Sequence, residues 1–463
     1  MSSPAILYLL VAMALAGFWI LLGCASLRER AWRAAGISWG GLMLTIAASI
    51  FLYAVLQDSP ALLLLLALLP PIVLGVLFLP LGSVRTLAIR PRTERAGERV
   101  DERDVIFARE EYLPGSEKYT VYYERHPELR ALDDRIRALP PLLEPGGYYY
   151  DTTHSSALEL RFEELEALTP EVDGPVAPQR KDLDAQQATD GIKTTLLRAG
   201  ADAVGIAELD PAFVYTHVGR GPEPWGTRIE QRHRYAIAFT LEMDFDHVVA
   251  APTLAITEET ATQYLRGARI SIALARRIRD WGHPARAHIA GSNYQVMLPP
   301  IAHAAGLGEL GRLGYLISPR LGPRVRLGVV TTDLPLVSDR PIAFGVQDFC
   351  DRCRKCARNC PSGAIPHGAP RTVRGVTKWP LGIEACLSYW RQIGTDCGLC
   401  MRVCPYSHPP TFIHNLVRAA VRRSAVARAL AVWGDDLLYG RRIGARPDVN
   451  ARPGGAAGSE ESS

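Results

Sequence analysis

The stretch Cys350-Asp-Arg-Cys353-Arg-Lys-Cys356-Ala-Arg-Asn-Cys360-Pro361 places four cysteines at the short intervals that are typical of bacterial [4Fe–4S] ferredoxins. Such intervals let three thiolates from one loop bind the same cubane cluster. The fourth cysteine, which precedes a proline, points to a second cluster. The segment therefore predicts a ferredoxin-like fold that binds iron–sulfur clusters.

A second run, Cys386-x10-Cys397-x2-Cys400-x3-Cys404-Pro405, repeats this pattern with a longer first interval. Because the fourth cysteine of each run serves the other cluster, the two runs together predict two [4Fe–4S] clusters. One cluster is assigned to Cys350, Cys353, Cys356 and Cys404, and the other to Cys360, Cys386, Cys397 and Cys400. Zinc also binds four cysteines, but zinc sites usually pair two short Cys-x2-4-Cys hooks and do not repeat this run.

Eight of the nine cysteines lie between Cys350 and Cys404, and the ninth is Cys24. A disulfide framework would spread its cysteines along a secreted domain, whereas a tight cluster at short spacing indicates metal binding. The thiolates must stay reduced, so we expect this part of the chain on the reducing side of a membrane.

The first 83 residues form a predicted membrane anchor, because three apolar runs there are each long enough to cross about 30 Å of hydrocarbon as a helix. The runs extend approximately over Ala5–Cys24, Ala34–Leu56 and Ala61–Leu81. Pro70 and Pro71 lie inside the third run and are expected to kink it.

The distribution of arginine predicts the orientation of these spans. The loop after the first span and the segment after the third span carry the positive charges, at Arg28, Arg30, Arg33, Arg85, Arg90, Arg92 and Arg95. The loop at residues 57–60 carries none. We therefore expect a multi-pass protein of the cell inner membrane, with the N-terminus outside and the catalytic part in the cytoplasm. Leu21-Leu-Gly-Cys24 resembles a lipoprotein cleavage site, but cleavage there would export the arginine-rich loop.

The remaining chain has the composition of a globular enzyme, and a net charge of +4 over 463 residues is too small to indicate nucleic acid as a partner. Periodicity predicts helices over 188–200 and 257–281 and strands over 203–209, 235–243 and 325–336, which favours an α/β sandwich. Residues 84 to about 190 are charged and are expected to be rich in loops. We divide the chain into a membrane anchor (1–83), an N-terminal cytoplasmic region (84–187), a catalytic domain (188–343), a ferredoxin-like domain (344–410), a helical segment (411–445) and a disordered tail (446–463).

The chain between about residues 185 and 440 resembles the corrinoid- and iron–sulfur-dependent reductive dehalogenases. The resemblance is carried by several ordered motifs: Ala188-Thr-Asp-Gly-Ile-Lys-Thr194, Leu197-Arg-Ala-Gly-Ala-Asp-Ala-Val-Gly-Ile-Ala207, Tyr235–Met243, Ala305-Gly-Leu-Gly-Glu-Leu-Gly-Arg-Leu-Gly314, Leu321-Gly-Pro-Arg-Val-Arg326, Thr332-Asp-Leu-Pro-Leu336, Phe344-Gly-Val-Gln-Asp-Phe-Cys350 and the stretched second cysteine run. It implies a nitroreductase-like α/β domain around a base-off cobalamin. The chain has no Asp-x-His-x-x-Gly motif, which is consistent with base-off binding.

The resemblance also implies three catalytic residues. Members of the family place a tyrosine as proton donor near the halogenated carbon, supported by an arginine and by an asparagine or lysine. By motif position these are Tyr264, Arg326 and Asn293, and Tyr294 is the rival tyrosine because the interval from Tyr264 to Asn293 is a few residues longer than the family interval. The alternative for each is structural: a core tyrosine and an arginine in an ion pair.

The segment Gly306-Leu-Gly308-Glu-Leu-Gly311 matches the dinucleotide-binding pattern G-x-G-x-x-G. That pattern requires a preceding strand, and residues 298–304 do not have the sequence of a strand. We therefore reject a nicotinamide cofactor and expect these three glycines to let the backbone approach the corrin closely.

The sequence thus predicts a membrane-anchored reductive dehalogenase that acts on an organohalide. Its electron donor is left open between quinol, ferredoxin and a separate reductase. Two alternatives are an epoxyqueuosine reductase, which shares the cobalamin and cluster core but acts on transfer RNA, and an electron-transfer subunit of a membrane complex, which would contain iron without cobalt.

Overall fold

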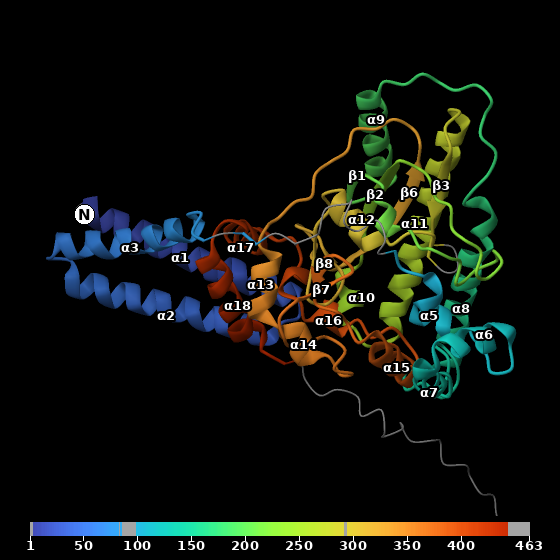
Figure 1. The fold of residues 1–463 in the computed structure, drawn as a ribbon. Coiled ribbons are helices and arrows are strands. Elements are labelled where there is room, and N and C mark those ends of the chain that lie inside the picture. The colour runs from blue at the N-terminus through green and yellow to red at the C-terminus, as the bar shows by residue number, and fades with distance from the viewer. Residues whose placement is uncertain (1–2, 83, 86–98, 291–293, 443–463) are drawn as a thin grey trace, which may run out of the picture.

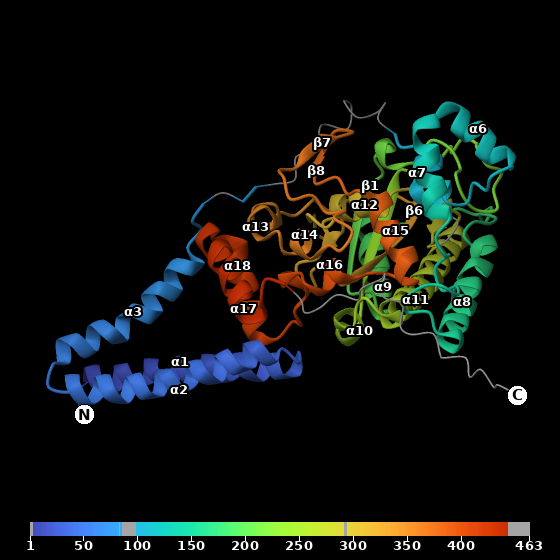
Figure 2. The same ribbon diagram turned by 90° about the horizontal axis from the view of Figure 1, so that it is seen from below.

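The computed structural model describes residues 3–82, 84–85, 99–290 and 294–442. Three long apolar helices extend from one side of a larger α/β body, and the last two helices of the described chain lie between the two parts (Figures 1 and 2).

The apolar helices are α1 (Ser3–Arg28), α2 (Trp32–Leu56) and α3 (Pro60–Phe78). Each is long and apolar enough to cross a membrane, so the three predicted spans are confirmed as helices. Pro70 and Pro71 lie inside α3, which remains helical on both sides of them.

A four-stranded antiparallel sheet with the order β1-β2-β6-β3 forms the centre of the body. Its strands are β1 (Ala203–Glu208), β2 (Tyr235–Glu242), β3 (Ala285–His288) and β6 (Val325–Thr332). Three of these strands and the long helix α11 (Leu254–Asp280) correspond to predicted elements. The predicted α/β class is therefore confirmed.

Alternation along β2 shows why the sheet is covered on both faces. Ile237 and Phe239 pack on one face against α9 (Ala185–Arg198) and α11, whereas Ala236 and Ala238 pack on the other face against α12 (Leu298–Ala304). Side chains of a strand point alternately to the two faces, so apolar residues at every position require a helix layer on each side. Short elements beside the sheet are α10 (Phe245–Val249), β4 (Glu309–Leu310) and β5 (Leu316–Ile317).

Residues 101–167 are largely helical, so the expected loop-rich character of this region is wrong. The helices are α5 (Ile106–Arg109), α6 (Glu117–Arg125), α7 (Pro127–Arg137) and α8 (Thr152–Ala167). The sequence obscures them because tyrosines, rather than aliphatic residues, make their small core, with Tyr112, Tyr119, Tyr122 and Tyr123 all buried. Several of these tyrosines also hydrogen-bond to aspartates through their hydroxyl groups.

The cysteine-containing region consists of short helices and one small hairpin. Its elements are α13 (Val346–Cys353), α14 (Lys355–Asn359), β7 (Arg371–Val373), β8 (Val376–Lys378), α15 (Ile383–Ile393) and α16 (Leu399–Arg402). Two further helices, α17 (Phe412–Arg423) and α18 (Ala425–Tyr439), follow it and contact the three apolar helices. They join the apolar helices to the body (Figure 1).

A buried polar network fixes this junction. Glu29, in the turn after α1, lies 2.7 Å from Nδ1 of His408, and Nε2 of the same imidazole lies 3.3 Å from a carboxylate oxygen of Asp435. Asp435 also pairs with Lys355, next to Cys356. Burial alone would lower the pKa of His408, but its hydrogen bonds to Asp435 and Glu29 raise that pKa to about 9. A protonated His408 therefore links two buried carboxylates.

The pKa of His408 is raised on folding from an ordinary 6.5, so its stabilising contribution is complete below pH 6.5 and is lost as the pH rises through about 9. We predict that the free energy of unfolding of the full-length protein in detergent falls over this range by at most about 3 kcal/mol. A decrease in the melting temperature reports this loss. His408→Gln should abolish this pH dependence, and substitution of the exposed His367 by Gln should not. An unchanged profile in His408→Gln would contradict the assignment.

Candidate functional site

The eight clustered cysteines lie on the short helices α13, α14, α15 and α16 and on the loops that follow or precede them. Arg354 separates Cys353 from Cys356 with a left-handed backbone at φ 51°, and Gly398 separates Cys397 from Cys400 at φ 61°. Arg354 ends α13 and begins α14, whereas Gly398 begins α16 only. Each run thus has one left-handed residue between two of its cysteines.

The thiols separate into two groups by their electrostatic neighbours. Burial raises the pKa of Cys404, and the nearby Cys350, Cys356 and Cys353 raise it further. Burial likewise raises the pKa of Cys397 to about 12, with Cys386 and Cys360 as its cysteine neighbours. We name Cys350, Cys353, Cys356 and Cys404 the first quartet, and Cys360, Cys386, Cys397 and Cys400 the second quartet. These names follow the crossed spacing of the sequence, and the assignment of each quartet to one cluster stays a prediction.

The two quartets adjoin each other and face different parts of the molecule. Cys400 of the second quartet has Cys356 of the first among its neighbours. Cys353 lies near Lys355 and Asp435, on the side of α18. The second quartet faces the sheet instead, because Cys400 and Cys386 raise the pKa of the partly buried Tyr315, which also neighbours Arg326.

The donor set fits a metal cluster. A buried thiol is costly to ionise without a positive partner, and the raised pKa values of Cys397 and Cys404 reflect this cost. Bound iron would supply the missing positive charge and hold all four sulfurs of a quartet as thiolates. Arg312 adds a further cation beside the first quartet, and its Nε donates to the Cys350 carbonyl at 3.0 Å.

Arg326 and Tyr264, which the sequence singled out, lie together. Nη1 of Arg326, on β6, lies 3.4 Å from the Tyr264 hydroxyl on α11, and the guanidinium carbon lies 5.0 Å from the centre of the tyrosine ring. Tyr264 lies in the middle of α11 and not near its start, because the helix begins at Leu254. Asn293 lies outside the described residues.

Asp396 and Thr260 complete this group and were missed by sequence reasoning. Nη2 of Arg326 lies 2.6 Å from the Thr260 hydroxyl and 3.7 Å from a carboxylate oxygen of Asp396. Burial raises the pKa of Asp396, while Arg326 and Thr260 oppose that shift. The sequence signal for Asp396 was its position immediately before Cys397. A carboxylate there lies between Arg326 and the second quartet.

Tyr294 lies among the same side chains but is held differently. Burial raises the pKa of its hydroxyl above the ordinary value, and Tyr264 raises it further. Although burial works against the charge of Arg326, the nearby Tyr264 and Asp396 raise the pKa of its guanidinium. The geometry thus couples Arg326 directly to Tyr264, whereas the structure records no hydrogen bond to the hydroxyl of Tyr294 in the part of the chain it describes.

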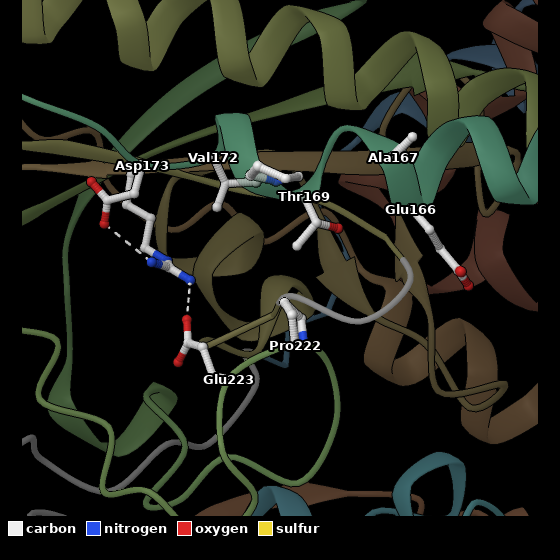
Figure 3. A pocket seen from close by; sticks show the side chains of 9 residues that line it. Glu166, Ala167, Thr169, Val172, Asp173, Pro222 and Glu223 are labelled. Atoms are coloured by element: carbon white, nitrogen blue, oxygen red, sulfur yellow. Dashed lines mark hydrogen bonds and ion pairs between the residues drawn. The ribbon is translucent and has the colours of Figure 1, made fainter.

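A surface pocket of about 600 Å³ opens near β3 (Figure 3). Arg286 forms part of its wall and is held between Asp173, at 3.1 Å, and Glu223, at 2.8 Å. A smaller cavity shares Pro222 and Glu223 with this pocket and is lined by Tyr294. The shared residues make the two spaces neighbours, so the pocket lies on the side of Tyr294 that leads to the surface.

The three glycines expected to face a corrin have protein atoms against them. A side chain at Gly306 would meet the Arg340 carbonyl, and side chains at Gly308 and Gly311 would meet Ile317. Packing within the protein therefore already requires glycine at these positions, and their contact with a corrin stays a prediction.

The sequence is similar to an iron–sulfur domain family and to reductive dehalogenases. Residues 349–408 match the family model of the 4Fe-4S dicluster domain. The chain is 30% identical over 362 residues to the tetrachloroethene reductive dehalogenase of Sulfurospirillum multivorans, which covers 69% of this chain and 72% of that protein. It is also 30% identical over 284 residues to the tetrachloroethene reductive dehalogenase of Desulfitobacterium hafniense, about half of each protein.

Solved structures of reductive dehalogenases are also similar to this chain. A catabolic reductive dehalogenase in complex with 3-bromo-4-hydroxybenzoic acid aligns with a TM-score of 0.63 and 28% identity over 78% of this chain and 48% of the other. The structure of a reductive dehalogenase described in connection with B12-dependent dehalogenation aligns with a TM-score of 0.62 and 27% identity. The chain therefore spans about half the length of these solved structures.

We predict that Asp396→Ala destabilises the protein, because it leaves the partly buried Arg326 guanidinium without its carboxylate, at a cost of at most about 3 kcal/mol. Asp396→Asn should cost less, since the amide oxygen can still accept from Thr260. Chemical denaturation of the two variants measures the difference, with alanine at the exposed Asp182 as the control. A wild-type unfolding free energy for Asp396→Ala would show that the pair contributes nothing.

Proposed function

The chain belongs to the reductive dehalogenase family, and from this premise we propose that it replaces a carbon-bound halogen by hydrogen. The reaction is R–X + 2 e⁻ + H⁺ → R–H + X⁻. The observation that carries the proposal is the contact of Arg326 with Tyr264 on one side and Asp396 on the other, beside the second cysteine quartet. A proton donor and a point of electron delivery are thus adjacent.

Tyr264 is the proposed proton donor. A neighbouring guanidinium stabilises phenolate, so the contact with Arg326 favours release of the phenolic proton to carbon as the halide leaves. Thr260 and Asp396 hold Arg326 in place and are positioning residues. Asn293 is proposed to support the substrate beside them.

A base-off cobalamin is the proposed centre for carbon–halogen cleavage; when bound, it would supply a reduced cobalt as the source of electrons for the reaction. Two observations support a fit. Nε of Arg326 is buried and has no hydrogen-bond partner among the described residues, so a donor is available to a bound group. One of the similar solved structures is also a reductive dehalogenase described in terms of B12-dependent dehalogenation.

The two quartets are proposed to hold two [4Fe–4S] clusters that carry electrons in one direction. The first quartet lies toward α18 and the apolar helices, and the second lies toward Arg326. Electrons would therefore enter through the first cluster and leave through the second. The donor can be a quinol, a ferredoxin or a separate reductase.

The helices α1, α2 and α3 are proposed to anchor the enzyme in the inner membrane with the body in the cytoplasm. Their length and apolar composition support insertion. The arginines at positions 28, 30 and 33 support the orientation, because positive residues collect on the cytoplasmic side.

We expect anaerobically prepared protein, reconstituted with cobalamin and reduced with methyl viologen, to release halide from an organohalide. Tetrachloroethene and 3-bromo-4-hydroxybenzoic acid are suitable first probes, because they are the compounds named for its relatives. Tyr264→Phe should lower the rate by about 10²- to 10⁴-fold, as loss of a general acid does. Tyr294→Phe should retain the rate within a few-fold.

Absence of halide release from the wild type with a broad panel of organohalides would refute the proposed reaction. Equal rates for Tyr264→Phe and the wild type would refute only the assignment of the proton donor. Tyr294→Phe thus serves as the matched control, because it removes the same hydroxyl from a neighbouring position.

Iron analysis tests the two quartets separately. Cys353→Ala and Cys397→Ala should each retain about four of the eight iron atoms expected for two [4Fe–4S] clusters. Cys24→Ala, which changes the one cysteine outside the quartets, should retain all of them. A wild-type iron content in either quartet variant would contradict the assignment.

A further inference from the structure

Helix α18 presents an apolar face to its surroundings. Its exposed residues are Val426, Ala429, Leu430, Trp433 and Leu437. Trp433 is 63% exposed and Leu430 49% exposed. A helix on the surface of a soluble domain turns charged residues outward, so this arrangement is the reverse of the usual one.

The charged side chains of α18 point inward and fix the direction of its apolar face. Nε of Arg428 donates to Asp348 at 2.7 Å, Arg358 donates to Asp436 at 3.3 Å, and Asp435 pairs with Lys355. All three partners belong to the segment that carries the first quartet. Rotation of α18 would break these buried pairs, so its apolar face cannot turn into the protein.

Both ends of α18 are tied to the ends of the apolar helices. At its start, the Ala425 N–H donates to the Leu81 carbonyl at 2.7 Å, just beyond α3. Near its end, the Leu437 carbonyl accepts from Nε of Arg33 at 3.0 Å, at the start of α2. The helix therefore lies where α2 and α3 meet the body, as both views of the fold show (Figures 1 and 2).

Exposed positive charges surround the same boundary. They are contributed by the turn between α1 and α2 and by the end of α17, at Arg28, Arg30, Arg33, Arg422 and Arg423. The acidic residue of that turn, Glu29, is buried against His408. Arginines beside an apolar face with an exposed tryptophan match the chemistry of an anionic membrane surface, in which the ring lies at the level of the headgroups.

We propose that α18 lies in the membrane–water interface, with its apolar face in contact with lipid and the nearby arginines on anionic headgroups. The proposal rests on the insertion of α1, α2 and α3 into the membrane. On the opposite face of α18, Asp435 pairs with Lys355, which immediately precedes Cys356 of the first quartet. The membrane surface and the quartet thus lie on the two sides of a single helix.

Photo-crosslinking of the full-length protein in nanodiscs that contain phosphatidylglycerol tests the proposal. p-Benzoylphenylalanine replaces Trp433 or Leu430 in separate variants, and adducts are identified by mass spectrometry. Leu113 and Leu160 provide matched controls, because they are 63% and 64% exposed and lie in the body away from the apolar helices. Leu44, 71% exposed in the middle of α2, reports on membrane insertion itself.

The proposal predicts lipid adducts at positions 433, 430 and 44, and a background yield at positions 113 and 160. Adducts at position 44 without adducts at 433 and 430 would overturn the interfacial placement of α18 and leave the membrane anchor intact. An adduct to another protein or a second copy of the chain at position 433 would also overturn it. Absence of adducts at all three positions would refute the anchor and the inference together.

Discussion

Eight ionisable sulfurs packed into one buried segment are the constraint on which the rest of the structure depends. Burial and the neighbouring thiols raise the pKa of Cys350 and Cys404, so the protein alone disfavours the thiolates that metal binding requires. Bound iron would offset this cost by adding positive charge at the centre of each quartet. The segment also needs cations and hydrogen-bond donors around it, and it obtains them from Arg312 and Lys355.

The body and the apolar helices attach to opposite sides of this segment. On one side, Asp396 precedes Cys397 and reaches Arg326, which in turn contacts Tyr264 on α11. On the other side, Lys355 precedes Cys356 and reaches Asp435 on α18, and from there His408 connects to Glu29 at the end of α1. The second quartet is therefore connected through polar side chains to Arg326 and Tyr264, and the first quartet is connected in the same way to the proposed membrane anchor.

Local spacing and periodicity predicted the elements that depend on neighbouring residues. β1, β2 and most of α11 follow from short-range patterns, and the three apolar helices follow from composition alone. Features that depend on long-range packing were missed. The role of Asp396 depends on β6 and α11, which bring Arg326 and Thr260 to it. The chain from α5 to α7 packs through buried tyrosines that do not give a clear apolar period. The glycines at 306, 308 and 311 are required by packing against Arg340 and Ile317, and their contact with a corrin stays a prediction.

The metal content of anaerobically purified protein supplied with cobalamin tests the central claim most directly, because it separates an enzyme with a corrinoid from a membrane-bound electron carrier. We predict about eight iron atoms and one cobalt atom per chain. About eight iron atoms with no retained cobalt would contradict the claim and would leave two iron–sulfur clusters with no centre at which a carbon–halogen bond is broken.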